Sequence, residues 1–502
     1  MSGNVIILGP RGEALSTPKT RRAAALRTVK ARFDAAMTTD ENSRWWQAAD
    51  FIGPLSELDP GTRRTLRSRA RYECANNGYA AGMLRTLAVD TIGTGPGLQI
   101  VDYEIPRGDA VAVEDSFWEW CGAVRFAEKL RLMRMAKARD GESFAQFFEN
   151  PRVAHPVRFD FNPFEADMVA TTMYNTTIEN ILDGLFVDDY GNVTAYNVLR
   201  QHPGENYLTM ILKADVVPAR DIIDVAHINR PGAYRGVPEI LAALPLFALL
   251  RRYTLAVCRS AESAAEIAWF LKTQQAPSEM TFSDPFDLLD TERGMGMVLP
   301  EGYEAMQLKA EQPTTQYPQF KREILSEIAR CLGVPYNVAA GDSSSYNYSS
   351  GRLDARNYQK TIRVERSYWE NVALEPLFRR WWSEAILEDP AIPEGLRRAR
   401  PPRHAWTWDG EEHIDPLKES KADTTDLTSG ATTLATIYAR KGLDWEEALR
   451  QRAREIALCR ELGIPIPGEP LAAGLPAPVD EATLEDMAKQ AAEEQAEETS
   501  NA

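Results

Sequence analysis

Serine, aspartate and histidine occur in two short patterns that could support hydrolysis. Gly341, Asp342 and Ser343 form a GDS triplet, and Asp224 and His227 form a D-x-x-H pattern. A serine that a histidine activates, with an aspartate orienting the histidine, is a nucleophile for ester or amide bonds. Because geometry and not chain order defines such a triad, a hydrolase that uses Ser343 and His227 is one interpretation of the chain.

The surrounding sequence gives little support to hydrolysis or to nucleotide chemistry. Hydrolases with a GDS motif carry it near the N-terminus, ahead of the D-x-x-H, and here that order is reversed. The chain has no G-x-x-x-x-G-K-[ST] motif, so we expect no ATPase activity of that type. Residues 93–97 (GTGPG) are similar to a dinucleotide-binding turn, but they follow a predicted helix, and Pro96 lacks the backbone donor that a phosphate needs. We interpret them as the exit from a helix and predict that the chain is not an enzyme.

The cysteines and histidines are too dispersed for a metal centre or a disulfide framework. The chain has five of each, and no two cysteines form a C-x-x-C pair. His404 and His413 are the closest histidine pair, and their spacing matches no metal-ligand pattern. We therefore expect no metal and no cofactor, and cysteines that act as small hydrophobic residues in a reducing compartment.

Residues 328–358 carry the most informative local pattern. Their sequence, IARCLGVPYNVAAGDSSSYNYSSGRLDARNY, predicts a helix that cannot continue through Pro335. Residues 341–349 are almost all Gly, Asp, Ser, Asn and Tyr, which predicts an exposed loop. We expect Ser349 or Ser350 to cap a long helix that follows.

Three further segments, in order along the chain, strengthen this pattern. Residues 68–100 predict an arginine-rich helix, an Asn-Asn-Gly turn, a second helix and a glycine-rich exit. Residues 221–239 predict a short strand followed by Arg-Pro-Gly and Arg-Gly-Val-Pro turns, and residues 406–455 combine an Asp-Pro-x-Lys-Glu segment with helices. Together the four segments resemble the lambda-type family of phage portal proteins over about residues 60–460. The chain departs from the family pattern at Ile92 (in place of Val), Ala233 (where Gln is more common) and Leu417 (between Pro416 and Lys418).

Hydrophobic periodicity predicts a mainly helical α+β fold. Apolar spacings of three and four predict a helix over residues 114–137. Long helices are expected over residues 237–272 and 352–387, with Pro245 and Pro376 as points of kinking or initiation. Alternating or strongly apolar runs predict strands over residues 143–149, 157–161, 178–187, 193–200 and 294–298, with a hairpin turn at 188–192.

Composition limits the size and partners of the chain. At 502 residues it is too long for one core, and about three domains are expected. The net charge of −16 argues against a protein that grips nucleic acid over its whole surface. Ordinary solubility explains this charge, and so does a channel wall that repels the phosphates of sliding DNA.

The longest apolar run, around residues 240–250, is shorter than the ~18 residues of a membrane span, and the N-terminus has no secretory pattern, so we expect a soluble, cytosolic chain.

The resemblance implies a portal-type subunit with wing, stem, clip and crown regions that assembles into a ring, usually a dodecamer. The expected regions are a basic N-terminal arm (1–40), the α+β wing (41–236), a stem helix (237–272), the clip (273–315), a second stem helix (316–335), the tunnel loop (336–351), a long helix that returns to the wing (352–410), crown helices (411–467) and an acidic, disordered tail (468–502).

The implied function is that of a conduit at one capsid vertex, through which double-stranded DNA is packaged and later ejected. The implied partners are other copies of the chain, the DNA, a separate terminase, major capsid or scaffold proteins, and head–tail connector proteins, with no membrane. The implied location is the virion, with the host cytoplasm during assembly. Another minor capsid or scaffold protein is an alternative, although such proteins are expected to show coiled-coil heptads or a protease motif, and the sequence shows neither.

The resemblance also implies which residues line the channel. The tunnel-loop candidates are Asp342, Ser343, Ser344, Ser345, Tyr346, Asn347, Tyr348, Ser349 and Arg352, whose polar side chains would contact phosphate or sugar without trapping DNA. The stem candidates are Arg251, Arg252, Arg259, Lys321 and Arg322. An apolar stripe of Leu249, Leu250, Tyr253 and Val257 on the first stem helix is expected to be covered by neighbouring subunits.

Overall fold

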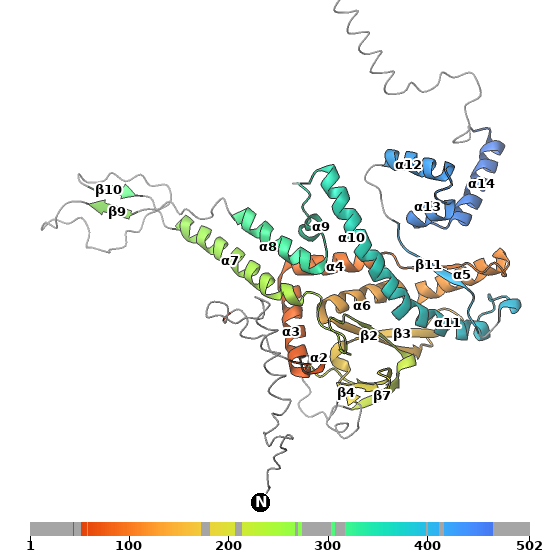
Figure 1. The fold of residues 1–502 in the computed structure, drawn as a ribbon, viewed down its shortest axis with the longest axis horizontal. Coiled ribbons are helices and arrows are strands. Elements are labelled where there is room, and N and C mark those ends of the chain that lie inside the picture. Colours follow the sequence, from red (N-terminus) through yellow and green to blue (C-terminus); the bar gives the residue numbers. More distant parts are fainter. Residues whose placement is uncertain are drawn as a thin grey trace, which may run out of the picture.

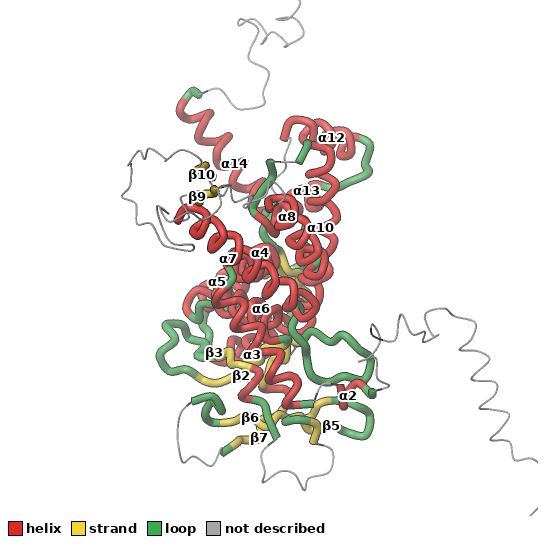
Figure 2. The backbone as a smooth tube through the Cα atoms, turned by 90° about the vertical axis from the view of Figure 1, so that its left-hand side faces the viewer, coloured by secondary structure: helices red, strands yellow, loops and turns green. Residues whose placement is uncertain are grey.

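The computed structural model shows a mainly helical α+β fold, as predicted (Figure 1). It describes residue 44 and residues 52–57, 59–171, 181–205, 213–266, 270–273, 303–306, 317–344, 346–397, 400–410 and 416–464. Two antiparallel sheets lie beneath a layer of helices in the main body, and a pair of helices projects from it (Figures 1 and 2). The predicted basic arm, the strand over 294–298 and the acidic tail lie outside the described residues.

The two sheets carry most of the predicted strands. A three-stranded sheet in the order β3-β2-β8 is formed by β2 (Glu142–Glu149), β3 (Phe159–Glu165) and β8 (Ile222–Ala226). A four-stranded sheet is formed in chain order by β4 (Ile181–Leu182), β5 (Leu185–Val187), β6 (Val193–Leu199) and β7 (Ala214–Pro218). The strand expected over 157–161 starts later and runs further, as β3. The hairpin turn at 188–192 is confirmed, because the Asp188 carboxylate accepts hydrogen bonds from the backbone amides of Tyr190 and Asn192.

The three-stranded sheet is buried on both faces. On one face Ala145 and Phe147 of β2 join the largest core, which the overlying helices complete. On the other face Phe144 joins a smaller core with Tyr196 and Val217 of the four-stranded sheet. This alternation follows from the period of two in a strand, and it gives the body three layers: helices, three-stranded sheet, four-stranded sheet.

Four helices at the N-terminal side cover the first face of this sheet and extend beyond it. They are α3 (Pro60–Asn76), α4 (Gly78–Ile92), α5 (Arg107–Ala123) and α6 (Phe126–Asp140), preceded by the short α2 (Pro54–Glu57). The Asn-Asn-Gly turn is confirmed, with the Asn77 side chain capping α4, which leads through its glycine-rich exit into β1 (Gly97–Ile100). The single helix predicted over 114–137 is wrong. It is divided between α5 and α6, because the backbone of Arg125 takes a left-handed conformation (φ 55°) that a helix cannot include.

The second helical layer is one long helix with a defect in its middle. It consists of α10 (Tyr348–Trp369), a π-helical turn (Glu370–Leu374) and α11 (Glu375–Glu388). The π-helical turn ends two residues before Pro376, the position where the sequence predicted a kink, because proline cannot donate the hydrogen bond that a regular α-helix needs there. Trp369, Trp381 and Trp382 from this helix are fully enclosed in the largest core.

The projecting pair is formed by α7 (Leu244–Glu266) and α8 (Tyr317–Leu332). At its far end β9 (Phe270–Thr273) and β10 (Tyr303–Met306) pair as a two-stranded antiparallel sheet (Figure 1). The helix predicted over 237–272 is therefore shorter at both ends. Pro245 lies in its first turn, where a proline costs no hydrogen bond, and residues 270–273 are a strand. Strand β9 therefore occupies the last residues of the predicted helix.

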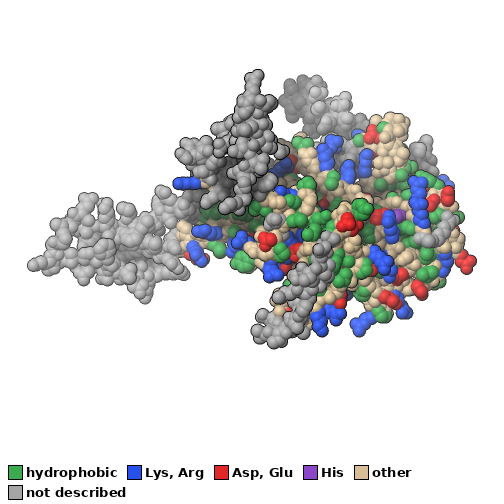
Figure 3. All heavy atoms as spheres, turned by 60° about the horizontal axis from the view of Figure 1, so that its bottom comes forward, with side chains coloured by type: hydrophobic (Ala, Val, Ile, Leu, Met, Phe, Trp, Pro, Cys, Tyr) green, Lys and Arg blue, Asp and Glu red, His purple; other side chains and the backbone are tan. Residues whose placement is uncertain are grey.

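The C-terminal helices form a separate group at the other end of the body. These are α12 (Pro416–Thr428), α13 (Leu434–Arg440) and α14 (Trp445–Leu462), which divide the helical region expected over 411–467. They follow β11 (His404–Thr407), which pairs with β1. Arg107 at the start of α5 holds this group through ion pairs with Asp444 (2.9 Å) and Glu446 (3.1 Å). On the face in Figure 3, Lys and Arg side chains are scattered among acidic and hydrophobic ones.

Candidate functional site

A buried cluster of charges joins the arginine-rich helix α3 to the three-stranded sheet. Glu142, at the start of β2, is fully enclosed, and its two carboxylate oxygens share a bifurcated hydrogen bond from the Arg235 guanidinium nitrogen Nε, at 3.0 Å each. Arg63 lies 3.2 Å from the same carboxylate. Burial by itself favours the neutral acid, but Arg235 and Arg63 overcome this effect and lower the pKa of Glu142. Burial and the nearby positive charge of Arg235 lower the pKa of Arg63 to about 9.

Arg235 also explains the Arg-Gly-Val-Pro part of the sequence pattern. Its guanidinium donates to three backbone carbonyls, those of Ala166, Val169 and Asp183, so that one side chain ties together the loops around both sheets. Gly236 donates its amide to Glu142. A Cβ atom on Gly236 would overlap the backbone of Gly141, so only glycine allows the two segments to approach this closely.

The remaining arginines of α3 continue the cluster toward the surface. Arg67 pairs with Asp167 at 2.7 Å, and Arg71 pairs with Asp140 at 2.8 Å and with Asp167 at 2.8 Å. Arg63, Arg67 and Arg71 are four residues apart, so they lie on one face of the helix. This spacing is a signal in the sequence whose acidic partners, far apart in the chain, could not be identified without the fold.

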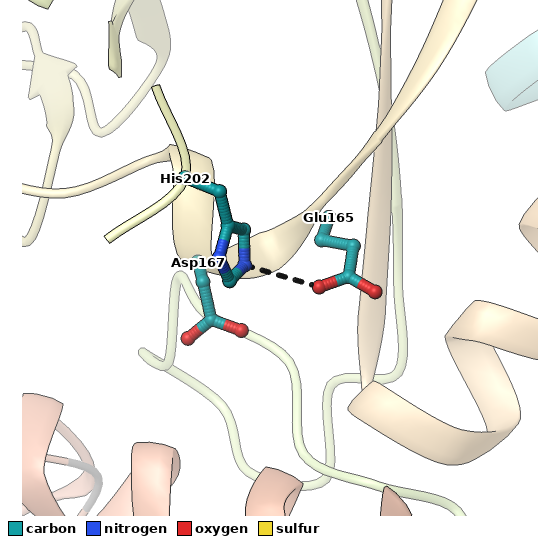
Figure 4. Close-up of side chains that lie close together, drawn as sticks. All are labelled: Glu165, Asp167 and His202. Carbon is teal, nitrogen blue, oxygen red and sulfur yellow. Dashed lines mark ion pairs between the residues drawn. The ribbon is translucent and has the colours of Figure 1, made fainter. Parts of the chain in front are cut away.

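Glu165, Asp167 and His202 are the three side chains in the described part of the chain that come close enough to share a metal ion (Figure 4). Their nearest ligand atoms lie within 4.8 Å of one another. However, Arg71 already contacts Glu165 at 3.1 Å and Asp167 at 2.8 Å. A divalent cation here would have to displace guanidinium groups from both carboxylates, so we interpret these residues as the rim of the ion-pair cluster.

The three residues of the hydrolase interpretation lie in unrelated surroundings. The Asp224 carboxylate accepts a hydrogen bond from the Tyr196 hydroxyl (3.0 Å) between the two sheets. Burial lowers the pKa of His227, and the charges that act on its ring come from Glu239, Lys137, Glu365 and Arg134. Ser343 lies in an exposed turn, where its carbonyl accepts from the Tyr346 amide. This geometry gives the hydrolase interpretation no support.

The loop that joins the projecting pair to the long helix is shorter than predicted. Residues 336–351 were expected to form it, but α9 (Tyr336–Ala340) occupies the first five, and α10 already begins at Tyr348. The loop is therefore limited to residues 341–347. Gly341 ends α9 in a left-handed conformation (φ 65°), which favours glycine at a helix C-terminus.

Two turns give the loop a defined shape. The Asp342 carboxylate accepts from the Ser344 amide (2.9 Å), and its pKa is lowered by its hydrogen bonds with the Ser344 side chain and backbone. At the other end Asn347, and not Ser349 or Ser350, caps α10. Its side chain accepts from the Ser350 amide (2.8 Å), while the Ser350 hydroxyl accepts from the Asn347 amide (3.3 Å). These reciprocal bonds form a capping box, so the loop is anchored at both ends.

The candidate loop residues are not equally accessible. Asp342, Ser343, Ser344, Asn347, Ser349 and Arg352 are exposed. Tyr346 is half-buried, because its ring packs beside Gly351 in the first turn of α10. Burial and a hydrogen bond with Asp354 raise the pKa of Tyr346. Ser345 and the side chain of Tyr348 lie outside the described part of the structure.

Three of the five stem candidates are used inside the subunit. Arg251 on α7 pairs with Glu73 of α3 at 2.8 Å and covers the ring of Tyr72. Lys321 and Arg322 on α8 lie over the rings of Tyr79 and Tyr336, at 5.0 and 5.1 Å from the ring centres. Arg252 and Arg259 are exposed on α7.

Sequence reasoning missed a second buried charge group that fixes the long helix. Arg134 of α6 is enclosed and pairs with Glu239 at 3.1 Å and with Glu365 of α10 at 3.3 Å. Lys137, one turn later, contacts Glu365 at 2.6 Å. The spacing of three residues between Arg134 and Lys137 places them on one face of α6, but several other charged residues of this helix are exposed or half-buried, and the partners lie more than one hundred positions away.

In the described structure, therefore, buried charges bind secondary-structure elements to one another, and the exposed polar residues of the loop are held in a defined shape. This combination is typical of a structural subunit. A comparison with protein families agrees: the model for "phage portal protein, lambda family" matches residues 43–366. The chain belongs to the lambda family of phage portal proteins.

Individual relatives carry related names. The probable portal protein of Halomonas phage phiHAP-1 is 26% identical over 489 residues, which cover 90% of this chain and 91% of that protein. Portal protein B of Escherichia phage lambda is 27% identical over 172 residues, which cover 33% of this chain and 32% of that protein. Among solved structures, a chain from the neck of an empty GTA particle computed with C6 symmetry aligns with a TM-score of 0.41 at 14% identity, covering 75% of this chain and 93% of that one.

Proposed function

We propose that copies of this chain close into a ring at one capsid vertex, through which double-stranded DNA is packaged and later released. Family membership supports the portal role. In the proposed assembly, α7 and α8 form the stem, β9 and β10 belong to the clip, α12–α14 form the crown, and the two-sheet body is the wing. Terminase would dock at the clip during packaging, and head–tail connector proteins would dock there afterwards.

The observation that carries the ring proposal is the exposed apolar surface of α7. The helical stretch Leu241–Glu262 contains an 18-residue window with a mean hydropathy of 1.5, and by length and composition this stretch could cross a membrane. Only 22% of that window is buried within the subunit. Leu249 and Leu255 are exposed to 46% and 53%. An apolar helix of this kind on a portal subunit is explained by burial against neighbouring copies, since large exposed apolar patches mark interaction surfaces.

The position of the loop at 341–347 supports its proposed role in the channel. It joins α9, directly after the second stem helix, to α10, and its exposed residues are polar and uncharged apart from Asp342. A loop of this composition contacts phosphate or sugar without sequence preference. It also lacks the density of lysine and arginine that would hold DNA in place against a motor.

Electron microscopy of the purified chain tests this function directly. Closed rings with an axial hole are expected, and rings that complement a portal-deficient phage should restore packaged DNA. A protein that stays monomeric at micromolar concentration over a range of salt concentrations would contradict the ring proposal.

A further inference from the structure

One face of α10 carries four exposed cations, Arg352, Arg356, Lys360 and Arg363. None of them takes part in an ion pair or a ring contact within the described residues, whereas Arg366, on the inner side of the helix, donates to the carbonyls of Asp90 and Thr91. Their spacings of four, four and three residues place them in one line, about 16 Å long at 1.5 Å per residue. We call this line the α10 basic stripe.

Two apolar side chains border the α10 basic stripe. Leu353 and Val364 are exposed to 60% and 73%. At 100° per residue they lie together along one edge of the stripe. Single exposed cations are ordinary features of a surface, but four in a line beside two exposed apolar side chains form a surface that suits an acidic segment with apolar residues of its own.

DNA is a poor occupant for this surface. Each phosphate that a cation neutralises adds to the affinity, and a ring would repeat the four cations in every subunit. Such a ring would hold a duplex that must slide. DNA backbone also offers no apolar partner for Leu353 and Val364. The net charge of the chain, −16, also argues against a protein that binds nucleic acid over its whole surface.

The sequence itself contains a segment with the required chemistry. Residues 480–498 hold eight carboxylates and a single basic residue, Lys489, together with the apolar Leu484 and Met487. The described chain ends at Ile464, after α14. The connecting residues 465–479 can span up to about 50 Å when extended, so the segment has a wide reach from the end of α14.

We propose that the acidic segment 480–498 docks on the α10 basic stripe, on its own subunit or on a neighbouring copy. Its carboxylates pair with the four cations, and its apolar residues cover Leu353 and Val364. The consequence is that the helix next to the loop presents little positive charge to passing DNA. This role is separate from ring closure, which α7 and α8 are proposed to bring about.

A carbodiimide crosslinking experiment on the full-length protein tests the contact. This reagent joins a lysine amine to a carboxylate in contact with it, and Lys360 is the one lysine of the stripe. We expect crosslinks from Lys360 to residues 480–498, identified by mass spectrometry and lost at high salt, which screens exposed ion pairs. The variant Lys360→Arg keeps the charge and should abolish only these crosslinks.

A DNA-binding experiment tests the consequence. Substituting glutamine for Glu493, Glu494, Glu497 and Glu498 should uncover the stripe and strengthen binding of a short DNA duplex by at least about tenfold at low salt. Adding Arg356→Gln and Lys360→Gln should remove this gain, whereas Arg64→Gln and Arg69→Gln, at exposed positions of α3, should leave it in place.

Three results would overturn the proposal. One is the absence of any crosslink between Lys360 and residues 480–498. Another is an unchanged duplex affinity after the four glutamine substitutions. The third is that the unmodified protein already binds the duplex and that this protects Lys360 from the reagent, which would make the stripe a DNA site and not a docking site for the tail.

Discussion

Asp224 is a carboxyl group enclosed between the two sheets, where Tyr196 donates to it and Glu142 and Arg235 lie nearby. Burial, followed by the negative charge of Glu142, raises its pKa to about 7. The folded protein therefore keeps a proton that the unfolded chain releases above about pH 4. The contribution of Asp224 to the free energy of unfolding is therefore largest below pH 4 and falls as the pH rises from 4 to 7. Above pH 7 it no longer changes with pH. We expect Asp224→Asn to remove this loss, stabilising the protein at pH 8 by up to about 4 kcal/mol.

Urea unfolding at pH 4, 6 and 8 measures the effect. Asp215→Asn is a suitable control, because Asp215 is exposed and paired with Arg200, which lowers its pKa. That substitution should not reproduce a gain that grows with pH. Equal stabilities of Asp224→Asn and the parent protein at all three pH values would show that Asp224 is ionised in the fold.

The buried pair of Arg235 and Glu142 gives a second prediction for single residues. Arg235→Leu should destabilise the protein by about 3–5 kcal/mol, because the enclosed Glu142 carboxylate keeps its desolvation cost and loses its main partner. Adding Glu142→Leu should recover part of this loss. Unfolding in urea measures both variants, with Arg200→Leu, in an exposed pair, as the control. A single variant as stable as the control would contradict the role assigned to Arg235.

At the scale of elements, the start of α10 depends on its capping box. Asn347→Ala should cost about 1 kcal/mol, concentrated in the first turn of α10, because the amides there lose their acceptor. Hydrogen exchange of those amides measures the effect. Ser349→Ala, in the same exposed turn but outside the box, should leave their protection unchanged.

Residues of the exposed loop at 341–347 can be removed without disturbing the hydrophobic core. Removing Ser343 and Ser344 keeps the Asn347 cap and deletes exposed residues, so folding and ring formation should be preserved. We expect reduced length or retention of packaged DNA. Packaged DNA length and electron microscopy of the same preparation are the measurements. Normal packaging would show that the loop is passive, and failed assembly would place it against a neighbouring subunit.

The whole assembly depends on the surface of α7. Leu249→Glu with Leu255→Glu should prevent ring formation but leave the subunit folded, since both side chains are exposed to about half. Light scattering after size-exclusion chromatography, together with circular dichroism, separates the two effects. Leu387→Glu, an exposed leucine on α11, is the control. Rings that form normally with the double variant would place the interface elsewhere.

Part of the expected interface turned out to belong to the subunit itself. Of the predicted stripe, Leu250 is buried within the monomer, and Tyr253 packs on Tyr317 and Phe320 of α8. Leu249 stays exposed, and Leu255, six residues later in the same helix, is exposed but was not predicted as part of the stripe. Periodicity identifies an apolar face, but it cannot divide that face between a partner helix of the same chain and one of a neighbouring subunit.

The sequence determined those features that depend on neighbours in the chain. The helix boundaries near Asn77 and Pro335, the Asp188 turn and most of the alternating strands follow from local backbone preferences, and these predictions were correct or close. The single strand expected over 178–187 is wrong, because Asp183 and Gly184 turn the chain between β4 and β5. The family resemblance rests on the same local motifs. Where local preferences compete, as at Arg125 between α5 and α6 or at the cap of α10, the prediction failed by a few residues.

Tertiary structure decided which charged groups meet. Arg235 reaches Glu142, 93 positions earlier, and Lys137 reaches Glu365, 228 positions later. In an unfolded chain such groups are solvated separately, and nothing in their spacing selects one partner over another. Only the packing of α3, α6 and α10 around the three-stranded sheet excludes water from these charges. Where water is excluded, the ion pairs and hydrogen bonds between these charged side chains are stronger, and they hold the elements of the subunit together.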